Sequence, residues 1–471
     1  MKKFNKDSYL KKLKLKRNWQ RFSKYFCVGI PCVLCLVLGI YFAYSKFFVS
    51  KEQSVVRTTV GDFIYGDVVI NAYIDGEYSS TIPGKNDGYV VDKVSCDNGA
   101  VGKWNNDKWG LLTTNLSKRT KCNVYFKKVV SKVSDIIAQL DTTGKCPTMN
   151  ADGSVNVTGL EATNGYLCKA KDAYGDSYYY RGNVTNNYVK FADKYWRIVR
   201  INGDGTVRVI YDGTSAHANG ESSRDRQIGT SVFNSSYNDN AYVGYMYGKI
   251  GASTYAAAHA NTNDSTIKAY IDNWYKTNIV GTTNEQYLAD NVFCNDRSIS
   301  SNKPTSNYNN LGYGTNVTAY RWYYGPWESG GYNSSMRLMC PQKNDAFTVS
   351  DITNGNGALT YPVGLLSADE IVLAGGWNAA NSGYYLYSGQ YWWASSPFDF
   401  NGNYARVRSI GSSGYANYSD YVNNNNGVRP VFNLKAEVLK YGDGTASNPY
   451  RLTESLDNSS SSESGGIDTG D

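Results

Sequence analysis

Histidine is scarce in this sequence, because only His217 and His259 occur among 471 residues. A histidine-rich metal site needs several imidazoles, and a Ser-His-Asp triad needs one placed beside its two partners. Each histidine stands alone among small and polar neighbours, which argues against both kinds of site. Glycine-rich phosphate loops are missing as well, because the Gly-x-Gly at 203–205 lies in a predicted hairpin without a following helix.

Signatures of metal and redox chemistry are equally absent outside the first fifty residues. None of the six cysteines found there has a Cys-x-x-Cys spacing, so zinc and thioredoxin-type chemistry lose their usual motif. The loop at Asp204 resembles a fragment of a calcium loop, but the rest of the ligand spacing is missing. We therefore expect no metal and no cofactor, and calcium has no supporting motif.

Positive charge is concentrated at the N-terminus. Residues 1–24 hold ten Lys/Arg and one acid, a net charge of +9, so the rest of the chain carries −2 of the total +7. A basic protein is expected to bind nucleic acid when its charge lies on a folded face. Here the charge lies on a short tail, and we expect no nucleic-acid partner.

Long apolar runs are confined to one place, residues 25–45, which contain no charged side chain. About 20 apolar residues span a bilayer, and flanking Lys/Arg set the orientation. This pattern predicts a basic cytoplasmic tail over 1–24 and a transmembrane signal anchor over 25–48, hence a single-pass membrane protein with its C-terminal domains extracellular. The alternative is a cleaved signal peptide, for which the segment YFAYSKFF (41–48) offers a poor cleavage site.

An even number of cysteines follows this segment. Six cysteines in an oxidising space predict disulfides, and six allow about 15 connectivities. Pairing of sequence neighbours is favoured, because each such pair falls within one proposed segment: Cys96–Cys122, Cys146–Cys168 and Cys294–Cys340.

The remaining sequence divides by its patterning. Residues 55–127 alternate as in a small β-sandwich-like domain, and 128–145 have helical spacing that suggests a helical linker. Residues 146–453 form the largest domain, and 454–471 have no apolar periodicity and are expected to be a disordered tail.

Within the largest domain, three segments have clear local signals. Residues 195–213 are a β-hairpin around Asn202 to Gly205, and 265–279 have one apolar face at helical spacing. Residues 365–376 form a second short helix with a capping box and a terminal glycine. Two short helices among twisted antiparallel sheets predict an α+β fold.

These segments together resemble a known group of proteins. The sequences YWRIVRINGDGTVRVIYDG (195–213), YPVGLLSADEIVLAGG (361–376), YWWASSPF (391–398) and GVRPVFNL (427–434) are similar in order and spacing to membrane-anchored bacterial surface proteins. The C-terminal domain of that group has the C-type-lectin-like fold, in the branch shared with formylglycine-generating enzymes. The resemblance covers roughly 165–440 and implies a loop-rich C-type-lectin-like domain.

The sequence departs from the catalytic members of that branch. The oxidases need a pair of cysteines near the C-terminus, whereas the last cysteine here is Cys340, and the sulfoxide synthases need a histidine set. The sugar-binding motifs of calcium-dependent lectins are not intact. The resemblance therefore implies the non-catalytic branch, and we do not expect an enzyme.

The predicted function is that of a membrane-anchored extracellular binding or adhesion protein, whose partner is a glycan or a protein. Alternatives are a cell-envelope enzyme of the related branch, with carboxylates drawn from Asp369, Glu370, Asp399 and Asp420, and a structural envelope protein. The segment 398–426 is either a binding face or filler. Residue types suited to adaptable recognition loops give the candidate ligand-binding set: Trp377, Tyr384, Tyr385, Tyr387, Asp399, Asn401, Asn403, Arg406, Arg408, Tyr415, Asn417, Tyr418, Asp420 and Tyr421.

Overall fold

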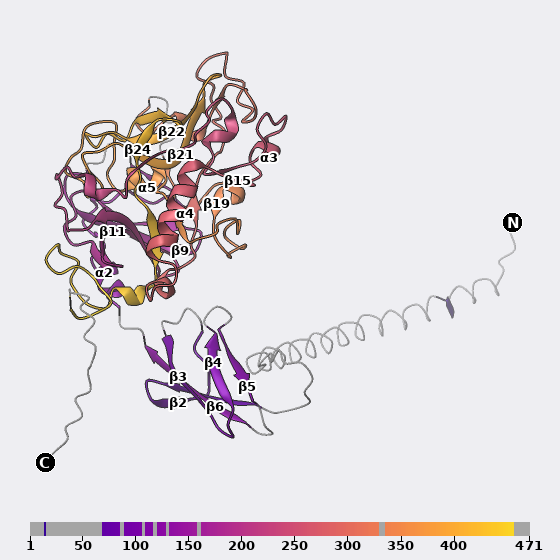
Figure 1. Cartoon of the computed structure of the whole chain (residues 1–471), viewed down its shortest axis with the longest axis vertical. Helices are drawn as coiled ribbons and strands as arrows, with labels where there is room; N and C mark the ends of the chain where they lie inside the picture. The colour runs from indigo at the N-terminus through magenta and orange to yellow at the C-terminus, as the bar shows by residue number, and fades with distance from the viewer. Residues whose placement is uncertain are drawn as a thin grey trace, which may run out of the picture. The chain divides into compact units, whose positions relative to one another are not determined.

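The computed structural model divides the chain into two compact units, Met1–Val129 and Val130–Asp471 (Figure 1). The structure describes residues 14–15, 68–84, 89–105, 109–115, 120–128, 131–157, 162–328 and 335–455.

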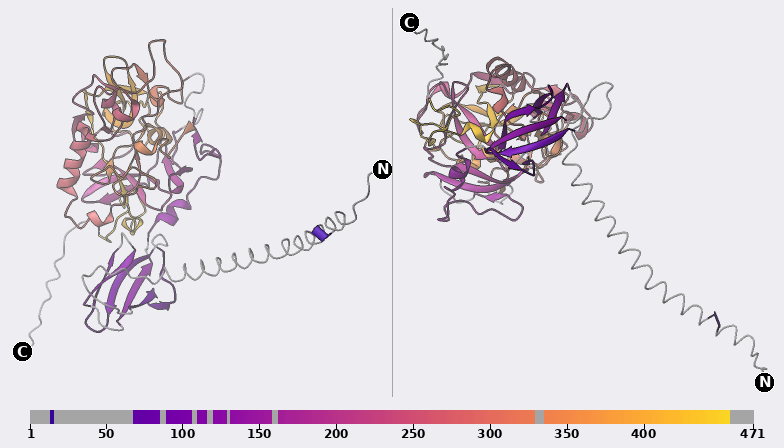
Figure 2. Two further views of the ribbon diagram at one scale, coloured as in Figure 1. Left: turned by 90° about the vertical axis from the view of Figure 1, so that its right-hand side faces the viewer. Right: turned by 90° about the horizontal axis from the view of Figure 1, so that it is seen from below.

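The smaller unit contains one four-stranded sheet and one hairpin, whose strands lie side by side in Figure 2. The order is β2-β1-β6-β3, with β1 parallel to β6 and β3 antiparallel to it. In β6, every second side chain is buried, as expected for a sheet with one face on a core. Trp104 and Trp109 of the hairpin pack on Phe126 of β6. The strands are β1 (Val69–Ile74), β2 (Glu77–Ser79), β3 (Tyr89–Cys96), β4 (Val101–Asn105), β5 (Gly110–Thr114) and β6 (Lys121–Lys128).

The larger unit is built on two main sheets. The first follows the order β20-β25-β12-β11-β9-β8, with β10 also paired to β11, and the second follows β13-β24-β21-β22-β23, with β17 also paired to β21. The strands of the first sheet are β8 (Tyr166–Asp172), β9 (Gly175–Arg181), β10 (Tyr188–Phe191), β11 (Lys194–Ile201), β12 (Val207–Gly213), β20 (Val363–Gly364) and β25 (Val431–Leu434). Those of the second are β13 (Thr230–Val232), β17 (Thr318–Ala319), β21 (Trp392–Phe400), β22 (Ala405–Ile410), β23 (Tyr418–Tyr421) and β24 (Asn425–Gly427).

Short strand pairs and helices complete the larger unit. The pairs are β7 (Val155–Asn156) with β18 (Ser335–Met336), β14 (Met246–Tyr247) with β15 (Asn263–Asp264), and β16 (Phe293–Cys294) with β19 (Ala346–Phe347). The α-helices are α2 (Val133–Ile137), α3 (Tyr255–Ala258), α4 (Thr266–Asn278) and α5 (Ala368–Leu373).

Helices α4 and α5 connect the two main sheets. Helix α4 begins at the side-chain cap of Ser265 and buries Ile267, Ile271 and Tyr275, which recur at helical spacing. It contacts β13 of one sheet and β20 of the other, whereas α5 contacts β21 and β9 (Figure 1). These contacts hold the second sheet in place on the rest of the unit.

A buried ion cluster lies at the centre of this arrangement. Glu370 of α5 accepts hydrogen bonds from Arg200 of β11 at 3.2 Å and from Arg208 of β12 at 2.7 Å. Arg200 also pairs with Asp172 of β8, and all four side chains are nearly inaccessible to solvent. Buried charges of this kind persist in folded proteins when they are paired and hydrogen-bonded.

The expected α+β fold class is wrong, because β-sheets dominate the described chain. The predicted helices at 265–279 and 365–376 are present as α4 and α5, but they span only 13 and 6 residues. The expected linker over 128–145 contains α2, which has five residues. Most of the backbone in the larger unit is instead occupied by short strands and by the loops that join them.

The expected single-pass membrane topology is also corrected. In the part of the chain that the structure describes, no helix combines the length and the apolar character needed to cross a bilayer. The segment 25–48, on which the prediction was based, lies outside the described residues, as do nearly all of 1–24 and residues 456–471.

The predicted disulfides are confirmed. Cys96 is bonded to Cys122, Cys146 to Cys168 and Cys294 to Cys340. The first joins directly opposed residues of β3 and β6. Three disulfides indicate folding in an oxidising compartment.

Candidate functional site

The strands β21, β22 and β23 and the two turns that join them carry ten of the 14 candidate residues. Strand β21 pairs antiparallel with β22, and β22 pairs antiparallel with β23. The turn between β21 and β22 is closed by the side chain of Asn401, which accepts hydrogen bonds from the backbone N–H groups of Asn403 at 3.0 Å and Tyr404 at 2.9 Å. Asparagine commonly closes turns in this way. The role of Asn401 is therefore to shape the turn.

Three exposed tyrosines lie next to this turn, and we call them the tyrosine ridge: Tyr237, Tyr404 and Tyr421. The ring of Tyr404 stacks on Tyr237 with centroids 4.9 Å apart, and it lies 4.7 Å from the ring of Tyr421. Their exposed fractions are 36%, 37% and 38%, so each ring keeps an accessible part. A hydrogen bond from the N–H of Ala405 to the carbonyl of Tyr237 fixes the loop of Tyr237 against β22.

An aromatic and arginine layer borders the ridge. Two guanidinium groups lie close to the ring of Phe398, that of Arg406 at 4.8 Å and that of Arg408 at 4.7 Å from its centroid. Tyr323 stacks on Phe398 at 4.7 Å. Cation–π contacts of this kind hold the side chains in fixed positions.

Arg406 is neutralised within this layer. It donates two hydrogen bonds of 2.7 Å to the two carboxylate oxygens of Asp399, and the Tyr308 hydroxyl donates to the same carboxylate at 3.0 Å. Because Asp399 is fully buried while 26% of the Arg406 side chain is exposed, the pair presents little net charge to solvent.

Arg408 is a buried cation that makes no ion pair with any described residue. It donates to the carbonyl oxygens of Trp322 and Tyr323 and, at 2.7 Å, to Oδ1 of Asn417. Burial lowers the pKa of Arg408 to about 9. The residue therefore orients Asn417 and the Trp322 turn, and its own accessible fraction of 1% keeps it from contacting a ligand.

The structure places the candidate residues at three levels of exposure. Tyr384 and Tyr385 belong to the hydrophobic core, and Asp399 of β21 and Arg408 of β22 are buried. Asn403, Tyr418 and Tyr421 are exposed. The half-buried candidates are Trp377, Tyr387, Asn401, Arg406, Tyr415, Asn417 and Asp420.

Several half-buried candidates have structural partners. Trp377 is bridged to Tyr415 and accepts a hydrogen bond from the N–H of Ala416. The carboxylate of Asp420 accepts hydrogen bonds from the side-chain amides of Asn424 and Asn426. The bridge fixes Trp377 next to the turn before β23, and both carboxylate oxygens of Asp420 accept hydrogen bonds from within the protein.

Sequence reasoning missed four surface residues at this sheet. Tyr404 lies in the turn between β21 and β22 and Tyr391 directly precedes β21, and a position at the end of a strand could have indicated their exposure. Tyr391 packs against Tyr418 with ring centroids 5.2 Å apart, which forms a second exposed pair. Tyr237 and Tyr323 come from distant loops, and no sequence signal places them here.

The carboxylates considered for catalysis are held in structural bonds. Asp369 is buried and binds Arg321, the indole N–H of Trp322 and the N–H of Arg337, and Glu370 binds two arginines. Among the described residues, no group of three or more His, Cys, Asp or Glu side chains could hold a metal ion.

The two histidines also have fixed partners. Both ring nitrogens of His217 lie within hydrogen-bond distance of carboxylates, those of Glu221 at 2.7 Å and Asp225 at 2.9 Å. His259 packs on Tyr255 with ring centroids 3.8 Å apart, and burial lowers the pKa of His259 to about 3. His259 is therefore neutral at physiological pH.

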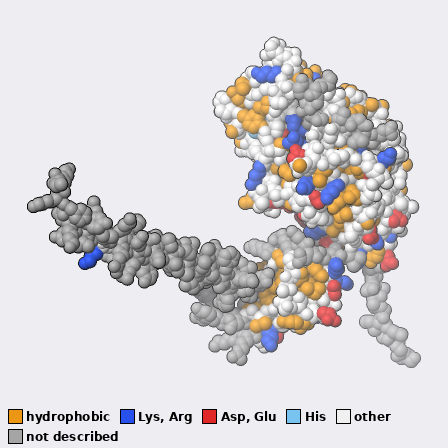
Figure 3. Space-filling view, turned by 180° about the vertical axis from the view of Figure 1, so that it is seen from behind, with side chains coloured by type: hydrophobic (Ala, Val, Ile, Leu, Met, Phe, Trp, Pro, Cys, Tyr) orange, Lys and Arg blue, Asp and Glu red, His pale blue; other side chains and the backbone are white. Residues whose placement is uncertain are grey.

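One face of the larger unit is mostly uncharged. On the face shown in Figure 3, neutral and hydrophobic side chains cover most of the area and charged groups are few. The tyrosine ridge, with its neutral amides and its neutralised arginine, has the same character.

Comparison with known proteins finds one family whose model matches part of the chain. Residues 334–436, which include α5 and β21 to β25, match a family described as a domain of unknown function (DUF6273). No curated protein and no solved structure matches the chain. The family match therefore covers Tyr404 and Tyr421 of the tyrosine ridge but not Tyr237, and it assigns no activity to them.

Proposed function

We propose that this protein is an extracellular binding protein that recognises a glycan through the tyrosine ridge. The observation that carries the proposal is the contiguous run of three partly exposed rings, Tyr237, Tyr404 and Tyr421, at the turn between β21 and β22. Three disulfides in the described chain support a location outside the reducing cytosol.

Ring chemistry favours this class of ligand. Tyrosine offers a large, rigid contact area at low entropic cost, and the outer face of a ring can pack against the C–H groups of a sugar. The exposed amide of Asn403 adds a hydrogen-bonding group beside the rings. Because Asp399 neutralises Arg406, the ridge is suited to an uncharged ligand.

A recognition role is also what the resemblance to the non-catalytic branch of the C-type-lectin-like fold implies. A protein ligand would use the same ridge, since tyrosine is common at protein interfaces. An envelope enzyme or a structural envelope protein would not require a ligand on the ridge, so one experiment separates these functions.

That experiment is a binding screen of the full-length chain against a glycan array and against immobilised surface proteins. We expect a glycan signal that falls at least tenfold in Tyr404→Ala and in Tyr421→Ala. The matched control is Tyr78→Ala, because Tyr78 is an exposed tyrosine of the smaller unit with an accessible fraction of 66%. A glycan signal that survives both ridge substitutions would refute the proposal, and a signal confined to proteins would replace the glycan with a protein ligand.

A further inference from the structure

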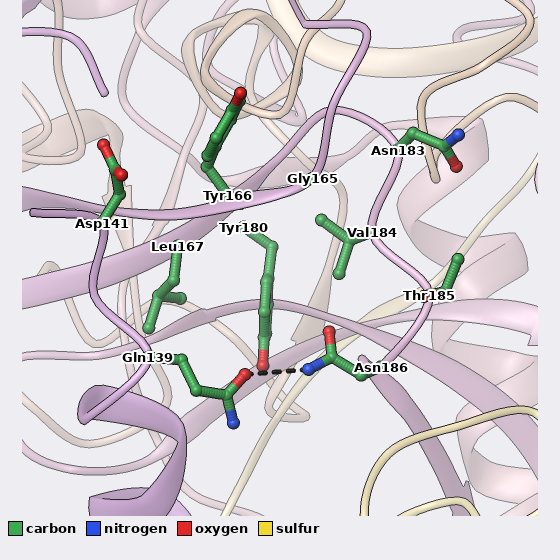
Figure 4. Close-up of a pocket in the computed structure, with 10 residues that line it drawn as sticks. All are labelled: Gln139, Asp141, Gly165, Tyr166, Leu167, Tyr180, Asn183, Val184, Thr185 and Asn186. Atoms are coloured by element: carbon green, nitrogen blue, oxygen red, sulfur yellow. Dashed lines mark hydrogen bonds between the residues drawn. The ribbon is translucent and has the colours of Figure 1, made fainter. Parts of the chain in front are cut away.

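A pocket of about 270 Å³ lies in the larger unit, between the segment after α2, the strands β8 and β9, and the loop that follows β9 (Figure 4). The carboxylate in its lining, that of Asp141, accepts hydrogen bonds from Thr143, Lys145 and Cys146. The hydroxyl of Tyr180 in its wall is closed off from solvent. The pocket therefore indicates no class of ligand.

The four-stranded sheet of the smaller unit has one covered face and one open face. On the covered face, Ala72 and Phe126 cluster with Leu111 and Trp104 of the hairpin. Successive side chains of a strand point to opposite faces, so the residues between these belong to the open face. We call the open face the lysine–tyrosine face, and the strand register places six residues on it: Tyr73, Tyr78, Lys93, Lys121, Tyr125 and Lys127.

One row of side chains crosses all four strands of this face. In the order β2-β1-β6-β3, the row is Tyr78, Tyr73, Tyr125 and Lys93. The rings of Tyr73 and Tyr125 stack with centroids 4.9 Å apart, and Tyr78 meets Tyr73 in a T-shaped contact at 6.0 Å. The Lys93 ammonium lies 6.0 Å from the centroid of Tyr125. Because the two inner rings cover each other, they offer a ligand their edges and hydroxyls.

Three lysines give the face its positive charge. Lys121 and Lys127 lie six positions apart on β6, a distance of ~20 Å at ~3.3 Å per residue, and Lys93 lies opposite Tyr125 between them. All three side chains are exposed, and none forms an ion pair with another residue that the structure describes. A linear polyanion laid along β6 would therefore pass all three ammonium groups.

The described acids of the smaller unit lie mostly off this face. Glu77 precedes Tyr78 and so points to the opposite side of the sheet. Asp75 and Asp97 stand at strand ends, where each accepts a backbone N–H. Asp92 lies at the bulge of β3. The face thus carries three positive charges against at most one negative charge.

Neutral polar groups lie beside the row and favour a hydroxyl-rich ligand. The amide of Asn71 donates to that of Asn123 at 2.9 Å, which fixes both side chains and leaves further amide hydrogens for a ligand. Single-stranded nucleic acids are bound through bases that stack on free ring faces. Tyr73 and Tyr125 cover each other's faces, so the charge of the lysine–tyrosine face suits a different polyanion.

We propose that the lysine–tyrosine face binds a linear acidic polysaccharide. Its carboxylates pair with Lys93, Lys121 and Lys127, and its hydroxyls bond the tyrosine hydroxyls and the two asparagine amides. This surface belongs to the smaller unit and selects an anionic chain, whereas the tyrosine ridge belongs to the larger unit and suits an uncharged ligand. The inference does not depend on the function proposed for the ridge.

Calorimetric titration of the full-length chain with hexagalacturonate tests this surface. We expect a Kd on the order of 0.1 mM at low salt. Lys93→Gln/Lys127→Gln should weaken binding about tenfold, or ~1.4 kcal/mol, which is within the range of two exposed ion pairs. Neither substitution should lower Tm, because both side chains are exposed.

The matched control is Lys103→Gln/Lys128→Gln. It removes the same charge from the same unit, but Lys103 lies on the hairpin and Lys128 alternates with Lys127, so neither belongs to the lysine–tyrosine face. We expect its Kd to stay within about twofold of the wild type. The basic residues 1–24 are present in every variant, so their contribution is the same throughout.

A second variant tests the hydroxyls without changing charge. Tyr73→Phe/Tyr125→Phe keeps the stacked rings and removes two hydroxyls that bond no described residue. It should weaken hexagalacturonate binding about threefold, as expected for the loss of exposed hydrogen bonds.

Neutral and acidic glycans separate the two surfaces. Maltohexaose, a neutral chain of the same length, should not bind the lysine–tyrosine face. Tyr404→Ala/Tyr421→Ala should retain hexagalacturonate binding, and Lys93→Gln/Lys127→Gln should retain any neutral glycan of the ridge. On a glycan array, acidic glycans thus report on this face and neutral glycans report on the ridge.

Three results would overturn the proposal. The first is no binding of hexagalacturonate up to ~2 mM, roughly twentyfold above the expected Kd. The second is equal weakening in the two lysine double variants. The third is equally tight binding of hexaglutamate or of a thymidine heptanucleotide, which would replace the polysaccharide with an acidic peptide or a nucleic acid.

Discussion

The buried ion cluster predicts that Glu370→Gln destabilises the larger unit. In Glu370→Gln, the neutral amide can still close the capping box of α5, in which Glu370 bonds the N–H of Ser367 at 3.0 Å. The substitution therefore removes the charge and leaves the cap. Arg208 then has no carboxylate partner in its buried position, because Asp172 pairs with Arg200.

The magnitude follows from the burial of this cluster. Removing one partner of a buried ion pair lowers the free energy of unfolding by about 3–5 kcal/mol. Unfolding entropy scales with chain length, so for a unit as large as Val130–Asp471 this loss lowers Tm by roughly 4–7 °C.

The pH dependence has a definite sign. Burial alone would raise the pKa of Glu370, but Arg208 and Arg200 outweigh it and hold the pKa below its usual value. A carboxylate with a lowered pKa stabilises the fold above its unfolded pKa of about 4.3. This contribution is lost as the pH falls through the lower pKa of the folded state.

Thermal unfolding followed by calorimetry between pH 3 and pH 7 measures both effects. The difference in Tm between wild type and Glu370→Gln should be largest near pH 7 and should shrink below about pH 4. Glu454→Gln is the control, because the Glu454 side chain is exposed. If Glu370→Gln lowers Tm no more than this control at pH 7, the cluster does not stabilise the unit as described.

Two further predictions concern covalent and local stabilisation. Replacing Cys294 and Cys340 by serine should destabilise the larger unit by about 2–5 kcal/mol, because their disulfide restricts the unfolded chain; a denaturant midpoint equal to that of the oxidised wild type would contradict this. Ser367→Ala should lower the free energy of unfolding by about 1 kcal/mol, because the Ser367 hydroxyl accepts a hydrogen bond from the N–H of Glu370 at 3.3 Å and caps α5. The control in the same melting assay is Ser306→Ala, at an exposed loop position of the same unit. Equal Tm values for the two variants would refute the capping role.

Local signals in the sequence predicted local structure well. The capping box at Ser367 and the apolar spacing of 265–279 correspond to α5 and α4, and the hairpin predicted at 195–213 corresponds to β11 and β12. The fold class could not be obtained in this way. Many strands have only two or three residues and exist through partners far along the chain, such as β18 with β7. Pairing of that kind leaves no periodicity in the sequence.

Prediction of the candidate site from the sequence was limited for the same reason, because segments far apart in the chain decide which side chains are buried. Composition identified the segment that forms β21 to β23, but it could not distinguish the exposed Tyr421 from the buried Tyr385. Arg408 and Asp399 have the residue types of a surface, yet backbone carbonyls and Arg406 satisfy them inside the protein. Tyr237 joins the ridge from more than 160 residues away, which only tertiary structure can show.

The most direct test of the central claim is the Kd of the best glycan from the screen for two double variants of the full-length chain. We expect Tyr404→Ala/Tyr421→Ala to weaken binding at least a hundredfold, about 2.7 kcal/mol for two ring contacts. Tyr391→Ala/Tyr418→Ala removes the second exposed pair of the same sheet and should leave the Kd within twofold of the wild type. Equal losses in the two double variants, or no loss in the first, would contradict recognition through the tyrosine ridge.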